Sequence, residues 1–221
     1  MGDPTITHNA KPTSTPRGWH CRGYLPHFDG GVEHPQSVTF RLADSIPSAV
    51  VQRWLAELNI LPTEKREIAL RKKCEAFLDS GYGSCHLLDP RVGAMVQSAV
   101  LHFEGERYQI HAWTVMPNHV HVLFTLFDGW SLSDVLGSWK SFTAHAANKI
   151  LGRSGQFWME DYFDRYIRDL DHFERITQYI ENNPVKAGLC EKSEDWPFGS
   201  AHPRWAANAA GMPAVPGKKP I

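Results

Sequence analysis

The first half of the chain shows one strand-like pattern of side chains followed by three helix-like patterns. Residues 36–42 alternate polar and apolar side chains in a β-branched run, which predicts a strand with one buried face. Apolar positions then recur at helical spacing in residues 46–59, 64–78 and 92–103. The sequence therefore predicts a strand followed by three amphipathic helices.

Two further strands are predicted in the middle of the chain. Residues 108–115 and 119–126 are dense in β-branched and aromatic side chains, and Met116, Pro117 and Asn118 separate the two runs. Because Pro and Asn both favour bends, we expect two adjacent antiparallel strands joined by a short turn.

The remaining patterns are helical. Residues 132–150 form one predicted helix, and another opens near residues 169–171. Glu174 stands three residues after Asp171, as in a capping box, and the helix is expected to end before Pro184. Strands and helices do not alternate regularly along the chain, so the pattern predicts an α+β domain.

Length and composition are those of one globular domain. We expect 221 residues to form a folded part over residues 18–205, flanked by disordered segments at 1–17 and 206–221, which are polar or Pro-rich and lack periodicity. No run is apolar enough for a membrane span or a signal peptide, so we predict a cytoplasmic protein without a membrane partner.

Charge and cysteine content exclude few classes of function. The net charge does not favour nucleic-acid binding, and the cysteine spacing does not favour a zinc site. The 23 basic and 24 acidic residues give a net charge of −1, whereas many nucleic-acid binders carry a basic excess. The four cysteines, at positions 21, 74, 85 and 190, form no C-x-x-C pair, which argues against a zinc site built from them.

Only one pair of histidines has a spacing that suggests a chemical role. His119 and His121 are two residues apart on a predicted strand, so their side chains emerge from the same face, while Val120, Val122 and Phe124 take the other face. Two adjacent imidazoles can coordinate one divalent ion. The spacing alone also fits an ordinary surface pair, or a zinc hydrolase that recruits a third ligand elsewhere.

A tyrosine and a carboxamide are presented together on the last predicted helix. Tyr179 lies beside an apolar stripe, and Asn183 follows four residues later on the same side of the helix. Each has a structural alternative, because Tyr179 fits an amphipathic residue at the edge of a core and Asn183 fits a helix C-cap before Pro184.

The segments together resemble a known family. MPNHVHVLF at residues 116–124 and YIENNPVKAGL at residues 179–189 are similar to motifs of the REP-associated tyrosine transposases, relatives of single-tyrosine HUH insertion-sequence transposases. The resemblance extends through WKSFT, FWMEDYFDRYIR and DWPF, and it covers roughly residues 105–200. Glu181-Asn182, ahead of Asn183, departs from the commonest family sequence.

The resemblance implies a fold, a site and a reaction. The fold is a ferredoxin-like α+β domain of the HUH nuclease type, an antiparallel sheet with helices on one face. His119, His121 and Asn183 are implied as ligands of Mg²⁺ or Mn²⁺, and Tyr179 is implied as the nucleophile that cuts and rejoins single-stranded DNA through a 5′-phosphotyrosine intermediate.

The resemblance also implies the partner. Single-stranded or hairpin DNA with short palindromic repeats is expected, and both monomer and homodimer stay open. Candidate phosphate contacts, each of which also fits a solvated helix charge, are Lys140, Arg165, Arg168 and Lys186. Candidates to stack on unpaired bases, for which buried packing is the alternative, are Trp139, Phe157, Trp158 and Trp196.

Two other functions fit the same residues. A metal-dependent hydrolase acting through bound water would make Tyr179 structural only. A domesticated relative that binds nucleic acid without cutting it would bind independently of metal.

Overall fold

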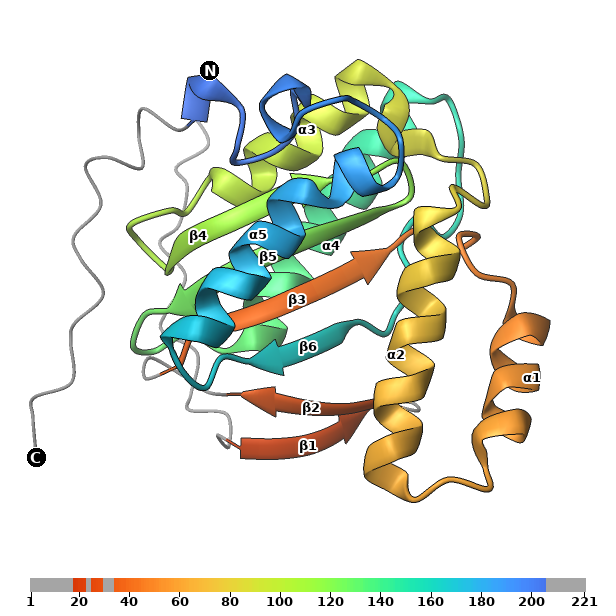
Figure 1. The fold of residues 1–221 in the computed structure, drawn as a ribbon. Coiled ribbons are helices and arrows are strands. Elements are labelled where there is room, and N and C mark those ends of the chain that lie inside the picture. The colour runs from red at the N-terminus through yellow and green to blue at the C-terminus, as the bar shows by residue number, and fades with distance from the viewer. Residues whose placement is uncertain (1–17, 23–24, 30–33, 206–221) are drawn as a thin grey trace, which may run out of the picture.

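The computed structural model describes residues 18–22, 25–29 and 34–205. Its centre is a four-stranded antiparallel sheet with the order β4-β5-β3-β6. These strands span Gln36–Arg41 (β3), Tyr108–Val115 (β4), His119–Leu126 (β5) and Phe163–Tyr166 (β6). A separate hairpin is formed by β1 (Gly18–Arg22) and β2 (Leu25–Asp29), with β2 next to β6 (Figure 1).

Five α-helices and two short 3₁₀ turns complete the described fold. The helices are α1 (Ser48–Leu58), α2 (Thr63–Asp79), α3 (Pro90–Leu101), α4 (Leu132–Ile150) and α5 (Leu170–Lys186). The 3₁₀ turns are η2 (His86–Leu88) and η3 (Ser193–Asp195). The α+β class and the antiparallel sheet are confirmed. The strand β6 was not expected from the sequence.

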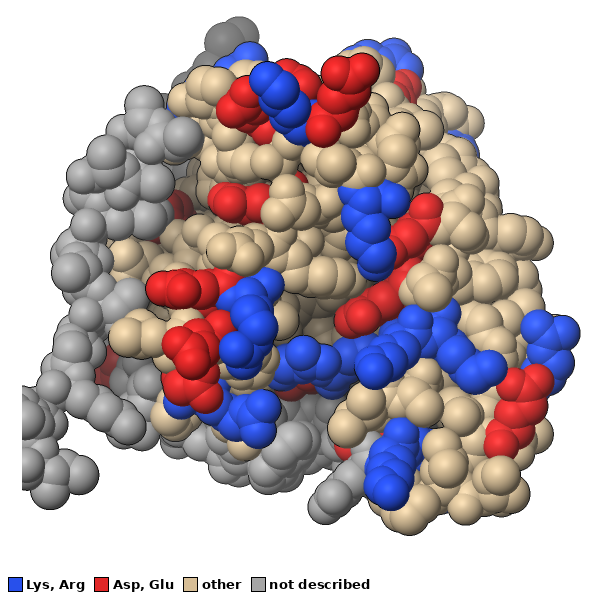
Figure 2. Space-filling view, viewed as in Figure 1, with Lys and Arg blue, Asp and Glu red and all other residues tan. Residues whose placement is uncertain are grey.

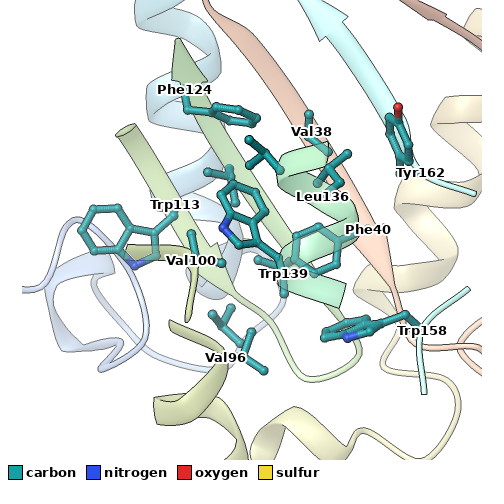
Figure 3. Packing of buried hydrophobic residues seen from close by; sticks show 14 of the residues in the cluster. Val38, Phe40, Val96, Val100, Trp113, Phe124, Leu136, Trp139, Trp158 and Tyr162 are labelled. Carbon is teal, nitrogen blue, oxygen red and sulfur yellow. The ribbon is translucent and has the colours of Figure 1, made fainter. Parts of the chain in front are cut away.

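One face of the sheet carries the main core and is covered by α3 and α4. The apolar side chains of β3 and β5, such as Phe40 and Phe124, pack against Trp139 of α4 (Figure 3). The indole N–H of Trp139 donates to the hydroxyl of Tyr108 at 2.9 Å, and that hydroxyl donates to the carbonyl of Val100 at 2.8 Å. The buried polar atoms of Trp139 and Tyr108 are thus paired.

The opposite face of the sheet is covered by α5. Leu123 of β5 and Ala112 of β4 pack against Ile180 of α5 and Ile167. Figure 1 shows α5 in front of the sheet, with α3 and α4 behind it. The expectation of helices on one face is therefore wrong in that detail. The reason is that β5 is apolar on both faces, since Leu123 follows the two histidines on the α5 side.

A smaller cluster fixes α1 and α2 at the β6 edge of the sheet. Trp54 and Leu58 of α1 pack with Leu70 and Cys74 of α2, and Phe163 of β6 belongs to the same cluster. Burial of this apolar surface holds α2 beside β6. Residues of α2 therefore line the same cavity as Tyr179 of α5.

The ends of α5 differ from those expected. The N-cap is Asp169, which accepts from the backbone N–H of His172 at 2.7 Å, rather than Asp171. The helix also passes through Pro184 instead of ending before it. The next turn is closed by bonds from Gly188 to Val185 and from Leu189 to the Pro184 carbonyl, each 2.9 Å, with Gly188 at φ +70°. These bonds pair carbonyls in the last turn of the helix, which have no helical N–H donor.

The segments 1–17 and 206–221, expected to be disordered, lie outside the described residues. Within the described part of the chain, no helix is both long and apolar enough to cross a membrane.

Candidate active site

The two histidines of β5 are buried on the α5 side of the sheet. His119 and His121 are 1% and 2% exposed, and their Nε2 atoms lie 3.0 Å apart. The strand positions both side chains, because residues two apart on a strand point to the same face. Two ring nitrogens therefore converge on one point under α5.

Asn118 fixes the tautomer of His119. Its side-chain N–H groups donate to the carbonyls of Leu78 and Tyr82, at 3.3 and 2.8 Å, so its carboxamide oxygen faces His119. That oxygen lies 2.7 Å from Nδ1 of His119 and can only accept, so Nδ1 carries the proton. Neutral His119 therefore presents a lone pair on Nε2.

The hydrogen-bond partner of His121 does not fix its tautomer. Its Nδ1 lies 2.7 Å from the hydroxyl of Thr39 on the neighbouring strand, and a hydroxyl can donate or accept. If Thr39 donates, Nε2 of His121 carries a proton that it can donate to His119. If Thr39 accepts, both Nε2 atoms present lone pairs, as a shared cation requires.

Both imidazoles are neutral near pH 7. Burial lowers the pKa of His119 well below its ordinary value, and the neighbouring His121 and Lys186 lower it further. Burial, followed by Lys186, lowers the pKa of His121 to about 3. Neutral imidazole is the form that binds metal ions.

Tyr179 of α5 packs against one of the two histidines, His121. Its ring meets that of His121 edge-on, with centroids 5.6 Å apart and an interplanar angle of 78°. Its hydroxyl is buried and has no hydrogen-bond partner among the described residues. Burial and then the carboxylate of Glu75 raise the pKa of Tyr179, while the nearby Asn183 offsets part of the rise. The hydroxyl is therefore protonated until something at the site stabilises the phenolate.

Asn183 lies one turn further along α5 and is completely buried. Within the described part of the chain, neither its carboxamide oxygen nor its nitrogen finds a partner. An unsatisfied buried carboxamide costs about 1–3 kcal/mol. Such an oxygen, one helical turn from Tyr179, is a donor of a type that can join two neutral imidazoles in binding a divalent ion.

Only two of the three candidate donors, the histidines, are of a side-chain type that usually dominates metal sites. In the described ranges, no group of three or more His, Cys, Asp or Glu side chains could hold a metal ion. The third candidate donor here is the amide oxygen of Asn183. The residues present therefore fit a metal ion only if a carboxamide completes the set.

Lys186 lies next to the same residues, as its predicted role requires. Its ammonium group lies 5.5 Å from the ring centroid of Tyr179 and 2.6 Å from a carboxylate oxygen of Asp79 at the end of α2. The ion pair ties α5 to α2. Lys186 also contributes positive potential at both histidines.

The other three predicted DNA contacts are dispersed. Arg165 of β6 lines a cavity together with His121 and Tyr179. Arg168 follows β6, and its backbone N–H donates weakly to His172, but it does not line that cavity. Lys140 lies on α4, across the sheet, where its ammonium donates to the Glu160 carbonyl at 2.7 Å and burial lowers its pKa to about 8. The structure therefore brings Arg165 and Lys186 to Tyr179, but not Lys140.

The four aromatic residues considered for base stacking are core residues instead. Each is no more than 9% exposed; they are Trp139, Phe157, Trp158 and Trp196. The indole N–H of Trp158 donates to Thr143, and that of Trp196 donates to the carbonyl of Val115. Buried packing is the correct interpretation for all four.

The sequence analysis missed residues that are far from the site in the sequence but next to it in the fold. Thr39 and Glu75 carry no local signal, because they are brought to His121 and Tyr179 only by the fold. Asn118 had a signal, since it adjoins His119, but it was interpreted only as a turn residue.

Comparison with known proteins agrees with this architecture. Residues 89–183 match the family model of the IS200-like transposases, and this segment runs from the start of α3 to Asn183. A REP-associated tyrosine transposase of Escherichia coli K12 is 30% identical over 113 residues, which are 49% of this chain and 64% of the relative. The chain thus matches somewhat less than two thirds of that relative's length.

A solved structure shares the fold. It is a REP-associated tyrosine transposase bound to a REP hairpin, with 21% identity, a TM-score of 0.51 and coverage of 86% of each chain. At this identity the likeness concerns the fold. The family model and the Escherichia coli relative make the chain similar to the IS200-like transposases and to the REP-associated tyrosine transposases, and the solved structure shares their fold.

Proposed function

We propose that this chain cuts and rejoins single-stranded DNA, with Tyr179 as the nucleophile. The observation that carries the proposal is the packing of the Tyr179 ring against His121, whose Nε2 converges with that of His119, together with a buried Tyr179 hydroxyl that has no partner among the described residues. A tyrosine that served only packing would expose its hydroxyl or bond it.

The proposed reaction is a transesterification at one phosphodiester. The oxygen of Tyr179 forms a bond to phosphorus as the bond from phosphorus to the 3′ oxygen breaks. The phenol proton is lost, and the departing 3′ oxygen gains a proton to become a hydroxyl. The 5′ end then stays attached to Tyr179 as a phosphotyrosine, and reversal of the step with another 3′-hydroxyl rejoins DNA without ATP.

We propose that His119, His121 and Asn183 together hold a divalent ion. The support is the pair of neutral imidazoles and the buried carboxamide that lacks a partner. When bound, the ion would act as a Lewis acid toward the scissile phosphate. Mg²⁺ prefers oxygen ligands, so two imidazoles favour Mn²⁺ over Mg²⁺ in vitro.

The chain's own residues orient the reacting groups. Asn118 and Thr39 hold the imidazole rings of His119 and His121, and packing of Ile180 on Leu123 fixes α5 over the sheet. The positive charge of Arg165 lowers the pKa of Tyr179 and so favours the phenolate. These contacts position the hydroxyl before DNA arrives.

The proposed substrate is DNA with a hairpin formed by short palindromic repeats. The similarity to REP-associated tyrosine transposases supports this choice, since the solved relative is bound to a REP hairpin. We place the scissile phosphate in an unpaired stretch of such DNA, because in-line attack needs an accessible backbone.

The test compares the protein with its Tyr179→Phe variant on labelled hairpin DNA taken from the flanks of its own gene. A denaturing gel, run with Mn²⁺ or with chelator, reports any covalent adduct. We expect a metal-dependent adduct that the variant does not form. Cleavage that survives the substitution would favour hydrolysis by bound water, and tight binding without cleavage under any metal would favour a non-catalytic binder.

A further inference from the structure

A groove beside the candidate active site is not used by the proposed chemistry. Its volume is about 310 Å³, and it lies between α2, the end of β6 and the first half of α5. His121 and Tyr179 line one end of it. Figure 2 shows Lys and Arg side chains gathered in a band across this face, over the region between α5 and α2.

The groove has more cations than carboxylates. Four cations line it, Arg71 and Lys72 from α2, Arg165 from β6 and Arg175 from α5, against the two carboxylates of Glu75 and Asp164. In the described part of the chain, none of these four cations has a carboxylate oxygen within 4.0 Å. Five other cations of the described residues, including Lys73 on the same helix, do have such a partner.

Two of the arginines lie close enough to repel each other. The guanidinium of Arg71 donates to the backbone carbonyl of Asp164 at 2.9 Å. This bond holds Arg71 close to Arg165, the residue that follows Asp164. Burial lowers the pKa of Arg71 and the positive charge of Arg165 lowers it further, while the carboxylates of Glu75, Asp164 and Glu67 offset part of this shift. An anion between the two guanidinium groups would relieve this repulsion and form charge-assisted hydrogen bonds.

The groove also has an apolar lining. Ile68 of α2 is 56% exposed, although it is a large aliphatic residue, and Phe163 and Ile176 line the same space. A free phosphate would use only the arginines. A nucleotide of single-stranded DNA uses both surfaces, since its phosphate is anionic and its base and sugar present apolar area.

We propose that this groove holds the DNA strand next to the scissile phosphate, with Arg71 and Arg175 contacting backbone phosphates from opposite walls. The proposal rests on the function proposed above and adds a path for the strand. It assigns a DNA contact to α2, which precedes the segment 89–183 that matches the family model. In this account α1 and α2 form a wall of the DNA site and do not merely cover the sheet edge.

The test measures the affinity for a short fluorescein-labelled oligothymidylate by fluorescence anisotropy over a series of salt concentrations. The variants are Arg71→Gln and Arg175→Gln. The matched control is Lys73→Gln, which removes the same charge from α2, on the side facing Glu57 and Trp54. We expect each groove variant to bind about tenfold more weakly, the loss of one charge-assisted contact.

The salt series identifies the contact as one to phosphate. Each groove variant should lower the slope of log affinity against log salt by about 0.7, while Lys73→Gln leaves affinity and slope unchanged. Equal affinities for groove and control variants would overturn the proposal. If Arg71→Gln fails to fold, Arg175→Gln decides the question, because Arg175 is exposed and has no ion pair among the described residues.

Adduct formation separates this proposal from the proposed function. If the protein forms no adduct with hairpin DNA but the groove variants lose affinity, the groove assignment stands and the tyrosine reaction fails. If the adduct forms and the groove variants bind like the control, the reaction stands and the strand takes another path.

Discussion

Asn118 accepts a hydrogen bond from Nδ1 of His119 at 2.7 Å while both its own N–H groups are held by backbone carbonyls. The carboxamide cannot flip without breaking these bonds, so the orientation of the imidazole is set before any ligand binds. The turn between β4 and β5 thus positions His119 as well as reversing the chain.

We predict that Asn118→Ala weakens binding of Mn²⁺ by about 10- to 100-fold, the usual effect of removing the partner of a metal-binding histidine. Isothermal titration calorimetry with Mn²⁺ measures it. The comparison variant is Tyr179→Phe, which should keep its metal affinity because the phenol is not among the proposed ligands. An unchanged affinity in Asn118→Ala would show that His119 is not a ligand.

Asn183→Leu should stabilise the metal-free protein while abolishing Mn²⁺ binding. Leucine has the same branched shape, and the buried carboxamide that it replaces has no partner in the described chain, so the free energy of unfolding should rise by about 1–3 kcal/mol. Urea unfolding in chelator measures the change. Asn118→Leu serves as the matched control and should destabilise, since its carboxamide is fully bonded; destabilisation by Asn183→Leu would contradict the account.

Trp139→Phe should destabilise the protein by about 1–3 kcal/mol without changing the affinity of the folded protein for DNA. The substitution removes the N–H that donates to Tyr108 and leaves a gap in the core. Thermal unfolding and the anisotropy assay give the two quantities. A loss of DNA affinity at unchanged stability would restore a stacking role for this residue.

Acidification should destabilise the protein partly through His111. Burial lowers the pKa of His111 to about 4, below the ordinary 6.5, so the folded state resists protonation more than the unfolded state. Its contribution is complete above pH 6.5 and is lost as the pH falls toward 4. His111→Gln, which can still bond Thr125, should lose less stability over this range when unfolding is followed in chelator. If stability falls equally with pH in the protein and in the variant, His111 is not a cause of the acid destabilisation.

Local patterns predicted the centre of the fold and the identity of the candidate site. The alternation in β5 put His119 and His121 on one face, and the helical stripe of α5 put Tyr179 beside Ile180, facing the sheet. Both are short-range properties of a strand or a helix. The α4 boundaries also follow from periodicity, with Ser131 as the N-cap.

Long-range contacts explain what the patterns did not predict. β6 is four residues long and carries Asp164 and Arg165, so its sequence does not have the periodicity of a strand. The ion pair between Asp79 and Lys186 joins residues 107 positions apart, and nothing near either one indicates the other. The wall that α2 contributes to the site therefore could not be predicted from the sequence.

The central claim is that Tyr179 forms the covalent bond to DNA, and the most direct test is to map the attachment site. The protein is incubated with hairpin DNA and Mn²⁺, digested with nuclease and protease, and the modified peptide is sequenced by mass spectrometry. The account predicts a nucleotide attached through phosphate to Tyr179. Attachment to another residue, or cut DNA with an unmodified Tyr179 peptide, would contradict it.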